Sequence, residues 1–307
     1  MTTDALNLVE KQELKDNLQS RKLMQRIAFG FIWLTGLIAV AVVVWIVGYV
    51  LVRGVQVIDL EFLTTRPRGG MSGEGGMSTT IVTTIYLVLF TTALATPLGV
   101  GAAVYLTEYA AEVSRGHPLI KRMVKLAHSG VEILAGVPSI IFGLFGFALF
   151  VSTLKMNFSL LSAGLSGACL ILPVIIRTSE EALLAVPRVY REASLGLGAN
   201  KWQTISQVVL PAALPGIITG VVLSIGRVVA ETAIFWVTLG GSYHLPENLN
   251  SAGRTMALHV YMLATETRAF EKAMGTSAIL ILVIIIINLL INLTSRRLSA
   301  RAMGKIH

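Results

Sequence analysis

Long apolar runs separated by short polar segments dominate the chain. Residues 27–52 and 79–107 contain no charged side chain, and residues 278–293 contain only Asn288 and Asn292 as polar breaks. A run of roughly 20 such residues matches a hydrocarbon core about 30 Å thick. A buried helix in a soluble protein seldom needs an apolar run of this length, so the pattern predicts helices that cross a membrane.

The spacing of these runs predicts an all-α integral membrane protein with about six transmembrane helices. We expect an N-terminal segment at 1–26, a transmembrane domain at 27–294 and a tail at 295–307. Pro138 and Pro173 interrupt the third and fourth spans, which is tolerated where neighbouring groups satisfy the freed carbonyl. The expected spans are 27–52, 79–106, 130–153, 157–176, 212–238 and 275–294.

Composition and charge agree with lipid as the solvent. The chain is 54% hydrophobic and 14% charged, whereas a soluble domain carries about 25% charged residues. The net charge of +8 does not indicate a nucleic-acid partner, because the basic residues flank the apolar runs. Lys and Arg are concentrated in the N-terminal segment, after the second span, between the fourth and fifth spans and at the C-terminus. The positive-inside rule therefore predicts that both termini are cytoplasmic.

The polar stretch 177–211 carries signals for short helices. Residues 178–183 are typical of a helix start, with two acidic residues near the positive end of the helix dipole. Pro187 suits the first position of a second helix. Gly196 and Gly198 are expected to stop that helix.

A third short helix is expected after these glycines. Asn200 can cap it, with Gln203 as the reciprocal partner of a capping box, and Pro211 is expected to end it before the fifth span. The two helices are amphipathic, so they either dock in a groove of a partner protein or lie against the membrane or their own chain. Their apolar stripes are Val189, Ala193 and Leu197, and Trp202, Ile205 and Val209.

One motif in this stretch resembles a family signature. Residues 192–198 read Glu-Ala-Ser, three further residues and Gly, and after nine more residues 208–211 read Val-Val-Leu-Pro. This pattern resembles the EAA motif of ABC importer permeases, with Ser194 in place of the second Ala and Val208 in place of Ile. The resemblance implies a coupling helix seated in a cleft of a cytoplasmic ATPase. The coupling positions are then Glu192, Ala193, Ser194, Gly198, Val208, Leu210 and Pro211.

Three further segments, 134–140, 177–182 and 210–217, are similar to phosphate importer permeases. With them the chain, from about residue 69 to 294, resembles the PstA-type permeases of phosphate ABC importers. The resemblance implies a type I permease fold in a bacterial cytoplasmic membrane. It also implies a PstC-type permease, two PstB-type ATPases and a PstS-type phosphate-binding protein as partners. This chain is then expected to bind no cofactor, while the partner ATPase uses ATP and Mg.

Charged and small residues inside the spans supply further candidates. Arg227 and Glu231 are four residues apart, so on one helix they lie on the same face and can pair. They indicate either a phosphate pathway, favoured by the resemblance, or a structural ion pair. Arg177 is a second pathway candidate or an orientation anchor, and Glu132 is interpreted as an acid at a helix start. Gly216 and Gly220 form a GxxxG pattern that permits close helix packing.

Enzymatic activity is not expected. The chain has no G-x-x-x-x-G-K-[ST] motif, so ATP must be hydrolysed by another polypeptide. His128, His244 and His259 show no ligand spacing and are interpreted as ordinary residues. The alternatives are a permease for another oxyanion, such as molybdate or sulfate, and a secondary transporter, although we find no inverted repeat of the kind many such transporters contain.

Overall fold

Helices form the regular structure throughout the residues that the computed structural model describes, which are 2–68, 73–110, 118–267 and 269–302. Within these ranges β-pairing is limited to two isolated bridges, Pro67–Gly75 and Gly240–Gly253. The last five residues of the expected C-terminal tail lie outside the described residues. The chain divides into two units, Met1–Val52 and Arg53–His307.

The first unit is a single helix, the greater part of α1 (Thr2–Val55). Its stretch Met24–Val55 is long and apolar enough to cross a membrane. The described side chains of residues 24–46 are all exposed. A helix that is apolar on every side is stable only when it is surrounded by other apolar material, and lipid supplies this.

The second unit is a bundle of helices that begins with α2 and ends with α13. Its elements are α2 (Leu60–Thr64), α3 (Ser78–Val104) with the π-turn η1 (Tyr105–Tyr109), α5 (Pro118–Gly136), α6 (Ser139–Gly146) with η2 (Phe147–Thr153), α7 (Leu160–Leu184), α8 (Arg188–Gly196), α9 (Lys201–Thr204) with η3 (Ile205–Val209), α10 (Leu210–Ala230), α11 (Ala233–Thr238), α12 (Met256–Thr265) and α13 (Phe270–Ala302).

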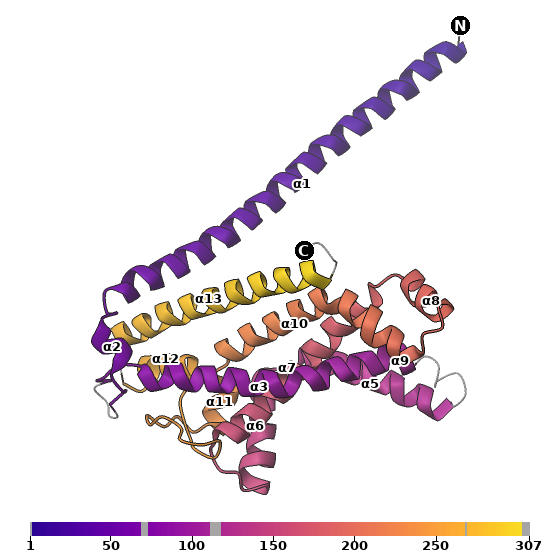
Figure 1. The fold of residues 1–307 in the computed structure, drawn as a ribbon. Helices are drawn as coiled ribbons and strands as arrows, with labels where there is room; N and C mark the ends of the chain where they lie inside the picture. Colours follow the sequence, from indigo (N-terminus) through magenta and orange to yellow (C-terminus); the bar gives the residue numbers. More distant parts are fainter. Residues whose placement is uncertain (1, 69–72, 111–117, 268, 303–307) are drawn as a thin grey trace. The chain divides into compact units, whose positions relative to one another are not determined.

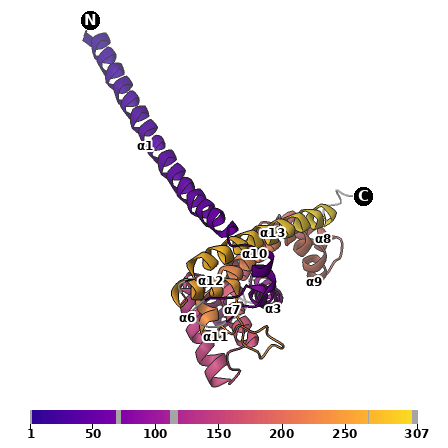
Figure 2. The same ribbon diagram turned by 90° about the vertical axis from the view of Figure 1, so that its left-hand side faces the viewer.

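Helix α7 is the central element of this bundle. It packs most extensively against α3 and α10 (Figure 1). In two perpendicular views α13 runs beside α10 and α12 (Figures 1 and 2). The main core is formed by residues such as Leu87, Val88, Phe142, Leu160, Leu170, Ile171, Ile175, Val228, Ile234 and Phe235.

The predicted GxxxG pattern sits at the contact between α10 and α7. A Cβ atom at Gly220 would overlap the side chain of Thr178, and one at Gly216 would crowd Ala182. The two glycines therefore let the helix backbones approach closely, as expected for small residues at a helix crossing in a membrane.

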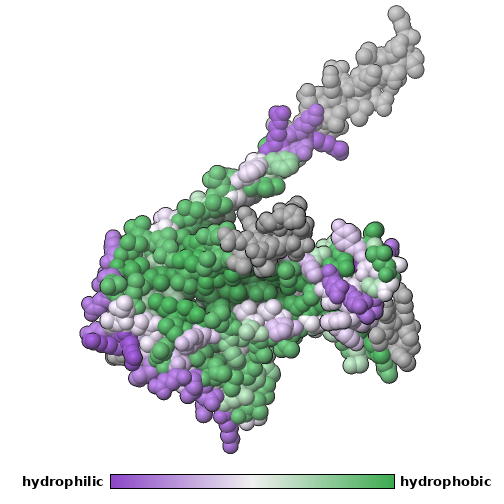
Figure 3. Space-filling view, viewed as in Figure 1, coloured by the Kyte–Doolittle hydropathy of each residue, from purple (hydrophilic) through white to green (hydrophobic). Residues whose placement is uncertain are grey.

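Five helical stretches among the described residues are long and apolar enough to cross a membrane, or six if one bent pair counts as a span. They are Met24–Val55, Ser78–Tyr109, Leu160–Leu184, Lys201–Ala230 and Phe270–Ile291, with Leu119–Gly136 and Ser139–Thr153 as the bent pair. Hydrophobic residues form a broad band across the visible face of the bundle, with hydrophilic residues toward its ends (Figure 3). This distribution fits a chain that lies across a bilayer.

The bent pair divides the range 130–153, which the sequence predicts as one span interrupted by Pro138. Helix α5 ends at Gly136, and the helix that starts at Ser139 departs by 105°. Pro138 has no backbone N–H to continue the helix and disfavours the α conformation at Val137, the residue before it. Pro138 itself is extended (ψ 138°) and precedes α6 as its N-cap.

Candidate functional site

The site is built on the segment between α7 and α10, and its first feature is the length of α7. The helix continues through Arg177 to Leu184. The prediction of a helix start at 178–183 is therefore wrong. Arg177 Nε lies 3.3 Å from Glu181 Oε1, one helical turn further on, which supports a continuous helix. Residues 177–184 also include no glycine or proline that could stop it.

Helix α8 has the two boundaries that the sequence predicts. Pro187 is its extended N-cap, and the chain leaves the helix at Leu197 and Gly198. Gly198 has a φ of +90° and nothing within 4 Å of an added Cβ. Glycine is thus required by the backbone conformation and not by lack of space.

Helix α9 begins with the predicted capping box. Gln203 N donates to Asn200 Oδ1 at 2.8 Å, and Asn200 N donates to Gln203 Oε1 at 2.9 Å. Pro211, however, does not end the helix, because a continuous helix runs from Lys201 to Ala230. Pro211 lies in the first turn of α10, directly after the π-turn η3. The wider turn accommodates a residue that lacks an N–H.

The apolar side chains of this segment divide into a buried set and an exposed set. Ile205 and Val209 are buried in the bundle. By contrast α8 buries no residue, and Leu197 beside it is 90% exposed. The other exposed apolar side chains of the segment are Val189, Tyr190, Leu195 and Trp202. Helix α8 therefore presents an uncovered apolar face, together with the exposed Glu192 and Ala193.

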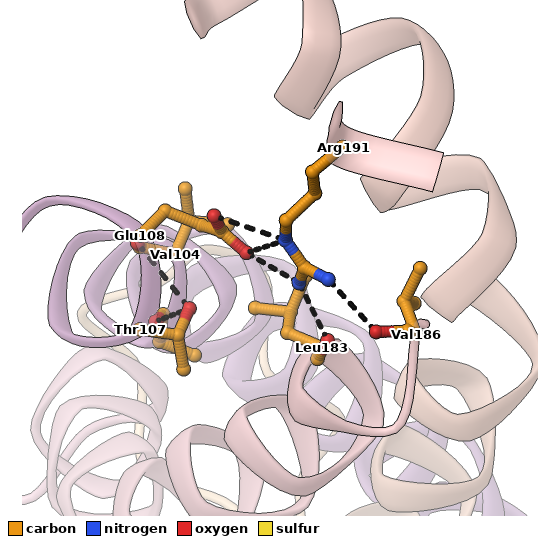
Figure 4. Close-up of polar contacts among 7 residues, drawn as sticks. Val104, Thr107, Glu108, Leu183, Val186 and Arg191 are labelled. Atoms are coloured by element: carbon orange, nitrogen blue, oxygen red, sulfur yellow. Dashed lines mark hydrogen bonds and ion pairs between the residues drawn. The ribbon is translucent and has the colours of Figure 1, made fainter. Parts of the chain in front are cut away.

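Two polar contacts hold α8 in place. Ser194 Oγ and Thr204 Oγ1 are 2.9 Å apart and connect α8 to α9. Arg191 Nη2 lies 2.7 Å from Glu108 Oε1 in η1 (Figure 4). The Arg191 guanidinium also donates to the carbonyl oxygens of Leu183 and Val186. The pair of Arg191 and Glu108 could not be predicted from the sequence, since nothing local connects two residues that are 83 positions apart.

The intramembrane charges are arranged differently from the prediction. Helix α10 ends at Ala230, and Glu231 is extended (ψ 130°), so the expected pair of Arg227 and Glu231 on one helical face is wrong. Glu231 Oε1 instead accepts from Ile234 N at 3.5 Å, at the start of α11. Within the described residues the half-buried Arg227 guanidinium has no hydrogen bond or ion pair. Arg227 is therefore the candidate pathway arginine whose positive charge no carboxylate neutralises within the described residues.

Arg177 belongs to a cluster of charged residues between α5 and α7. Its Nη1 lies 3.6 Å from Glu132 Oε1, and His128 Nδ1 lies 3.5 Å from Glu180 Oε1. These residues line a pocket of about 220 Å³. Glu132 is near the C-terminal end of α5, so its interpretation as a helix-start acid is wrong. Arg177 therefore shares its charge with two carboxylates, Glu132 and Glu181.

A buried arginine organises the loop between α11 and α12. Arg254 is 3% exposed and donates from Nε and Nη2 to the Gly241 carbonyl at 3.0 and 2.8 Å. Its Nη1 lies 3.2 Å from His259 Nδ1, and its guanidinium stacks 4.1 Å from the Tyr243 ring centroid. Because Arg can only donate, His259 Nδ1 accepts.

His259, which the sequence presents as an ordinary histidine, is therefore part of this network. Burial, and then the charges of Arg254 and Lys272, lower the pKa of His259 to about 3. The imidazole is neutral at physiological pH, as its role of acceptor requires.

Taken together, the helices long enough to cross a membrane and the exposed amphipathic helix before α10 define a multi-pass membrane protein. The chain belongs to the family of binding-protein-dependent transport system inner membrane components, whose match covers residues 121–304. This range contains α8, the capping box and Arg227.

Named relatives and a solved structure agree with this family. The chain is 34% identical to the phosphate transport system permease protein PstA 1 of Mycobacterium tuberculosis (strain ATCC 25618 / H37Rv), over 88% of this chain and 86% of that protein. It is 30% identical to the probable ABC transporter permease protein YqgI of Bacillus subtilis (strain 168), over 88% and 94%. A chain of a bacterial alginate ABC transporter has the same fold, with a TM-score of 0.59 at 14% identity over 87% of this chain and 95% of that one.

Proposed function

We propose that this chain is the membrane-spanning permease subunit of an ATP-driven importer of inorganic phosphate. It forms half of the translocation pathway, and a PstC-type permease forms the other half. The observation that carries the proposal is the uncovered apolar face of α8 on a chain 34% identical to a phosphate transport permease. An uncovered apolar face outside the membrane spans is typical of a protein interface.

Helix α8 is the element that couples transport to ATP hydrolysis. It docks in a groove of a PstB-type ATPase, and two ATPase subunits serve the two permeases. Glu192, Ala193 and Ser194 lie on this helix, and Gly198 sets the direction in which the chain leaves it. Val208, Leu210 and Pro211 fix the start of α10, so that a displacement of α8 reaches the bundle. The ATPase binds ATP and Mg, and this chain binds no cofactor.

This arrangement requires α8 in the cytoplasm of a bacterial cell, with both termini on that side of the cytoplasmic membrane. A PstS-type binding protein then delivers phosphate from the other side. Closure of the ATPase pair displaces α8 and with it α10, which alternates the access of the pathway. Such coupling needs contacts that differ between the two states.

Arg227 is the proposed phosphate ligand on the pathway. Its planar fork of N–H donors matches two phosphate oxygens, and within the described residues no carboxylate neutralises it. Glu231 and Arg177 are further pathway candidates. Glu231 lies directly after the last residue of α10, and Arg177 is a charged residue of α7.

The test is phosphate uptake by the complete complex in proteoliposomes. Uptake should depend on ATP, and molybdate and sulfate should compete poorly. Arg227→Gln should lower uptake by about 10-fold or more while assembly is retained, because a hydrogen bond to a charged group contributes about 1.5–3 kcal/mol. Arg122→Gln, at an exposed position of α5, is the matched control. Unchanged phosphate uptake by the Arg227 variant, or transport without ATP, would refute the proposal.

A further inference from the structure

Arg191 differs from its neighbours on α8 in where its guanidinium points. The side chains of Arg191 and Glu108 are only 20% and 11% exposed, whereas Arg188, one turn earlier, is exposed. The carboxylate of Glu108 receives Arg191 Nε at 3.1 and 3.3 Å and Nη2 at 2.7 Å. This is a bidentate, charge-assisted contact, the strongest kind of side-chain hydrogen bond.

The same guanidinium also reaches the end of α7. Nη2 donates to the Leu183 carbonyl at 2.9 Å and Nη1 to the Val186 carbonyl at 2.8 Å. The last carbonyls of a helix have no partner within the helix, and a cation there is also favoured by the helix dipole. One side chain therefore joins α8, the end of α7 and η1 (Figure 4).

Glu108, the partner of Arg191, lies in the π-turn η1 that directly follows α3. Across η1 the N–H of Ala110 bonds to the carbonyl of Tyr105, five residues back. Thr107 Oγ1 donates to the Ala103 carbonyl at 2.8 Å within the same region. A π-turn adds a residue to the helix and redirects the side chains that follow it, and such turns are frequent at functional sites.

A second contact joins the α8–α9 segment to the same π-turn, η1. Lys201 Nζ, at the start of α9, lies 4.7 Å from the ring centroid of Tyr109, and Ser194 links α8 to α9. Consecutive residues of η1, Glu108 and Tyr109, thus receive cations from both short helices. The segment is held to α3 as well as being continuous with α10.

We infer that the Arg191–Glu108 pair is the link through which α8 moves α3 and the end of α7 when an ATPase displaces it. The inference rests on the proposed docking of an ATPase on α8. Chain continuity alone carries a displacement of α8 to α10. The pair carries it directly to α3 and to the end of α7, the helix that packs against both α3 and α10. Arg191 acts as a positioning residue, because its guanidinium is engaged by Glu108 and by the carbonyls of Leu183 and Val186.

The test compares Arg191→Gln, Arg191→Lys and Glu108→Gln with the control Arg122→Gln in the complete complex. Retention of the ATPase, the rate of ATP hydrolysis and phosphate uptake per ATP are measured for each variant. Arg191→Gln should keep the ATPase bound and hydrolysing, while uptake per ATP falls about 10-fold, within the usual range of coupling energies. Glu108→Gln should shift the ratio in the same direction. The conservative variant Arg191→Lys should retain part of the ratio, since an ammonium replaces the charge but not the fork.

A cargo-independent readout separates this inference from the choice of phosphate. A fluorophore on Leu98→Cys, an exposed position of α3, in a Cys169→Ala background reports ATP-dependent movement of α3. The signal change should occur in the otherwise unsubstituted complex and be lost with Arg191→Gln. Absence of phosphate uptake would contradict the proposed cargo but would not contradict the inferred link between α8 and α3. Loss of ATPase retention, an unchanged uptake per ATP, or no ATP-dependent signal from α3 in the unsubstituted complex would overturn the inference.

Discussion

The loops at the two ends of α10 are each organised by one arginine, yet they leave very different surfaces (Figure 1). Arg254 is 3% exposed, and all its partners lie within the α11–α12 loop or in α12. Arg191 holds only the base of its loop, and Leu197 beyond it is 90% exposed. The α11–α12 loop is closed around its arginine and also accepts hydrogen bonds from Leu160 N and Leu161 N of α7, whereas the loop that carries α8 keeps an open apolar surface. The difference fits the proposal that the loop with α8 receives a partner, whereas the α11–α12 loop is organised around its own arginine.

The largest effect is expected where the closed loop is broken. Arg254→Gln replaces the three donor nitrogens that reach the Gly241 carbonyl and His259 Nδ1 by one amide nitrogen on a shorter side chain, so buried acceptors lose their donors. Buried acceptors without donors cost about 1–3 kcal/mol each, so the unfolding midpoint of the purified complex should drop clearly. Arg66→Gln, at an exposed position after α2, should leave the midpoint unchanged. A midpoint for Arg254→Gln equal to that of the control would show that the loop does not depend on its arginine.

In the open loop, which carries α8, a substitution should change partner binding and not stability. Leu197→Asp removes an apolar side chain that touches little in the isolated chain, so the unfolding midpoint should not change. Binding of the ATPase should weaken by about 10-fold, which corresponds to about 1.4 kcal/mol. The measurement is ATPase retained after purification, with Leu60→Asp, also at an exposed leucine, as the control. Equal retention for both variants would contradict a docking role for this face.

Of the two loops, only the closed loop should make the stability depend on pH. The pKa of His259 is lowered from 6.5 to about 3 in the folded chain. Between these values the unfolded state binds the proton and the folded state does not, so stability falls as the pH falls below about 6.5, by at most about 1.4 kcal/mol per unit. His259→Gln keeps an acceptor for Arg254 and should flatten this slope. An identical pH profile of the unfolding midpoint for both proteins would exclude His259 as its cause.

Local signals in the sequence predicted local structure well. The capping box of Asn200 and Gln203 and the stop at Gly198 each depend on a few neighbouring residues. Helix continuity was harder to predict. Residues 178–183 carry the acids of a helix start but end α7, and Pro211 follows a π-turn that lets the helix continue.

Ion pairs between distant segments could not be predicted from the sequence. Glu108 and Arg191 belong to different helices, and their pairing depends on how α3 and α7 pack. The predicted pair of Arg227 and Glu231 failed because α10 ends one residue before Glu231. Helical periodicity predicts which side chains share a face only as far as the helix extends, and the sequence did not show that α10 ends at Ala230.

Docking of an ATPase on α8 is tested most directly by the accessibility of one position on the open loop. Leu197→Cys, in the Cys169→Ala background, can be labelled with a membrane-impermeant maleimide in the permease pair with and without its ATPase. We predict rapid labelling from the cytoplasmic side without the ATPase and labelling slowed by about 10-fold or more when the ATPase is bound. Equal labelling rates in the two preparations, or labelling only from the opposite side of the membrane, would contradict the account.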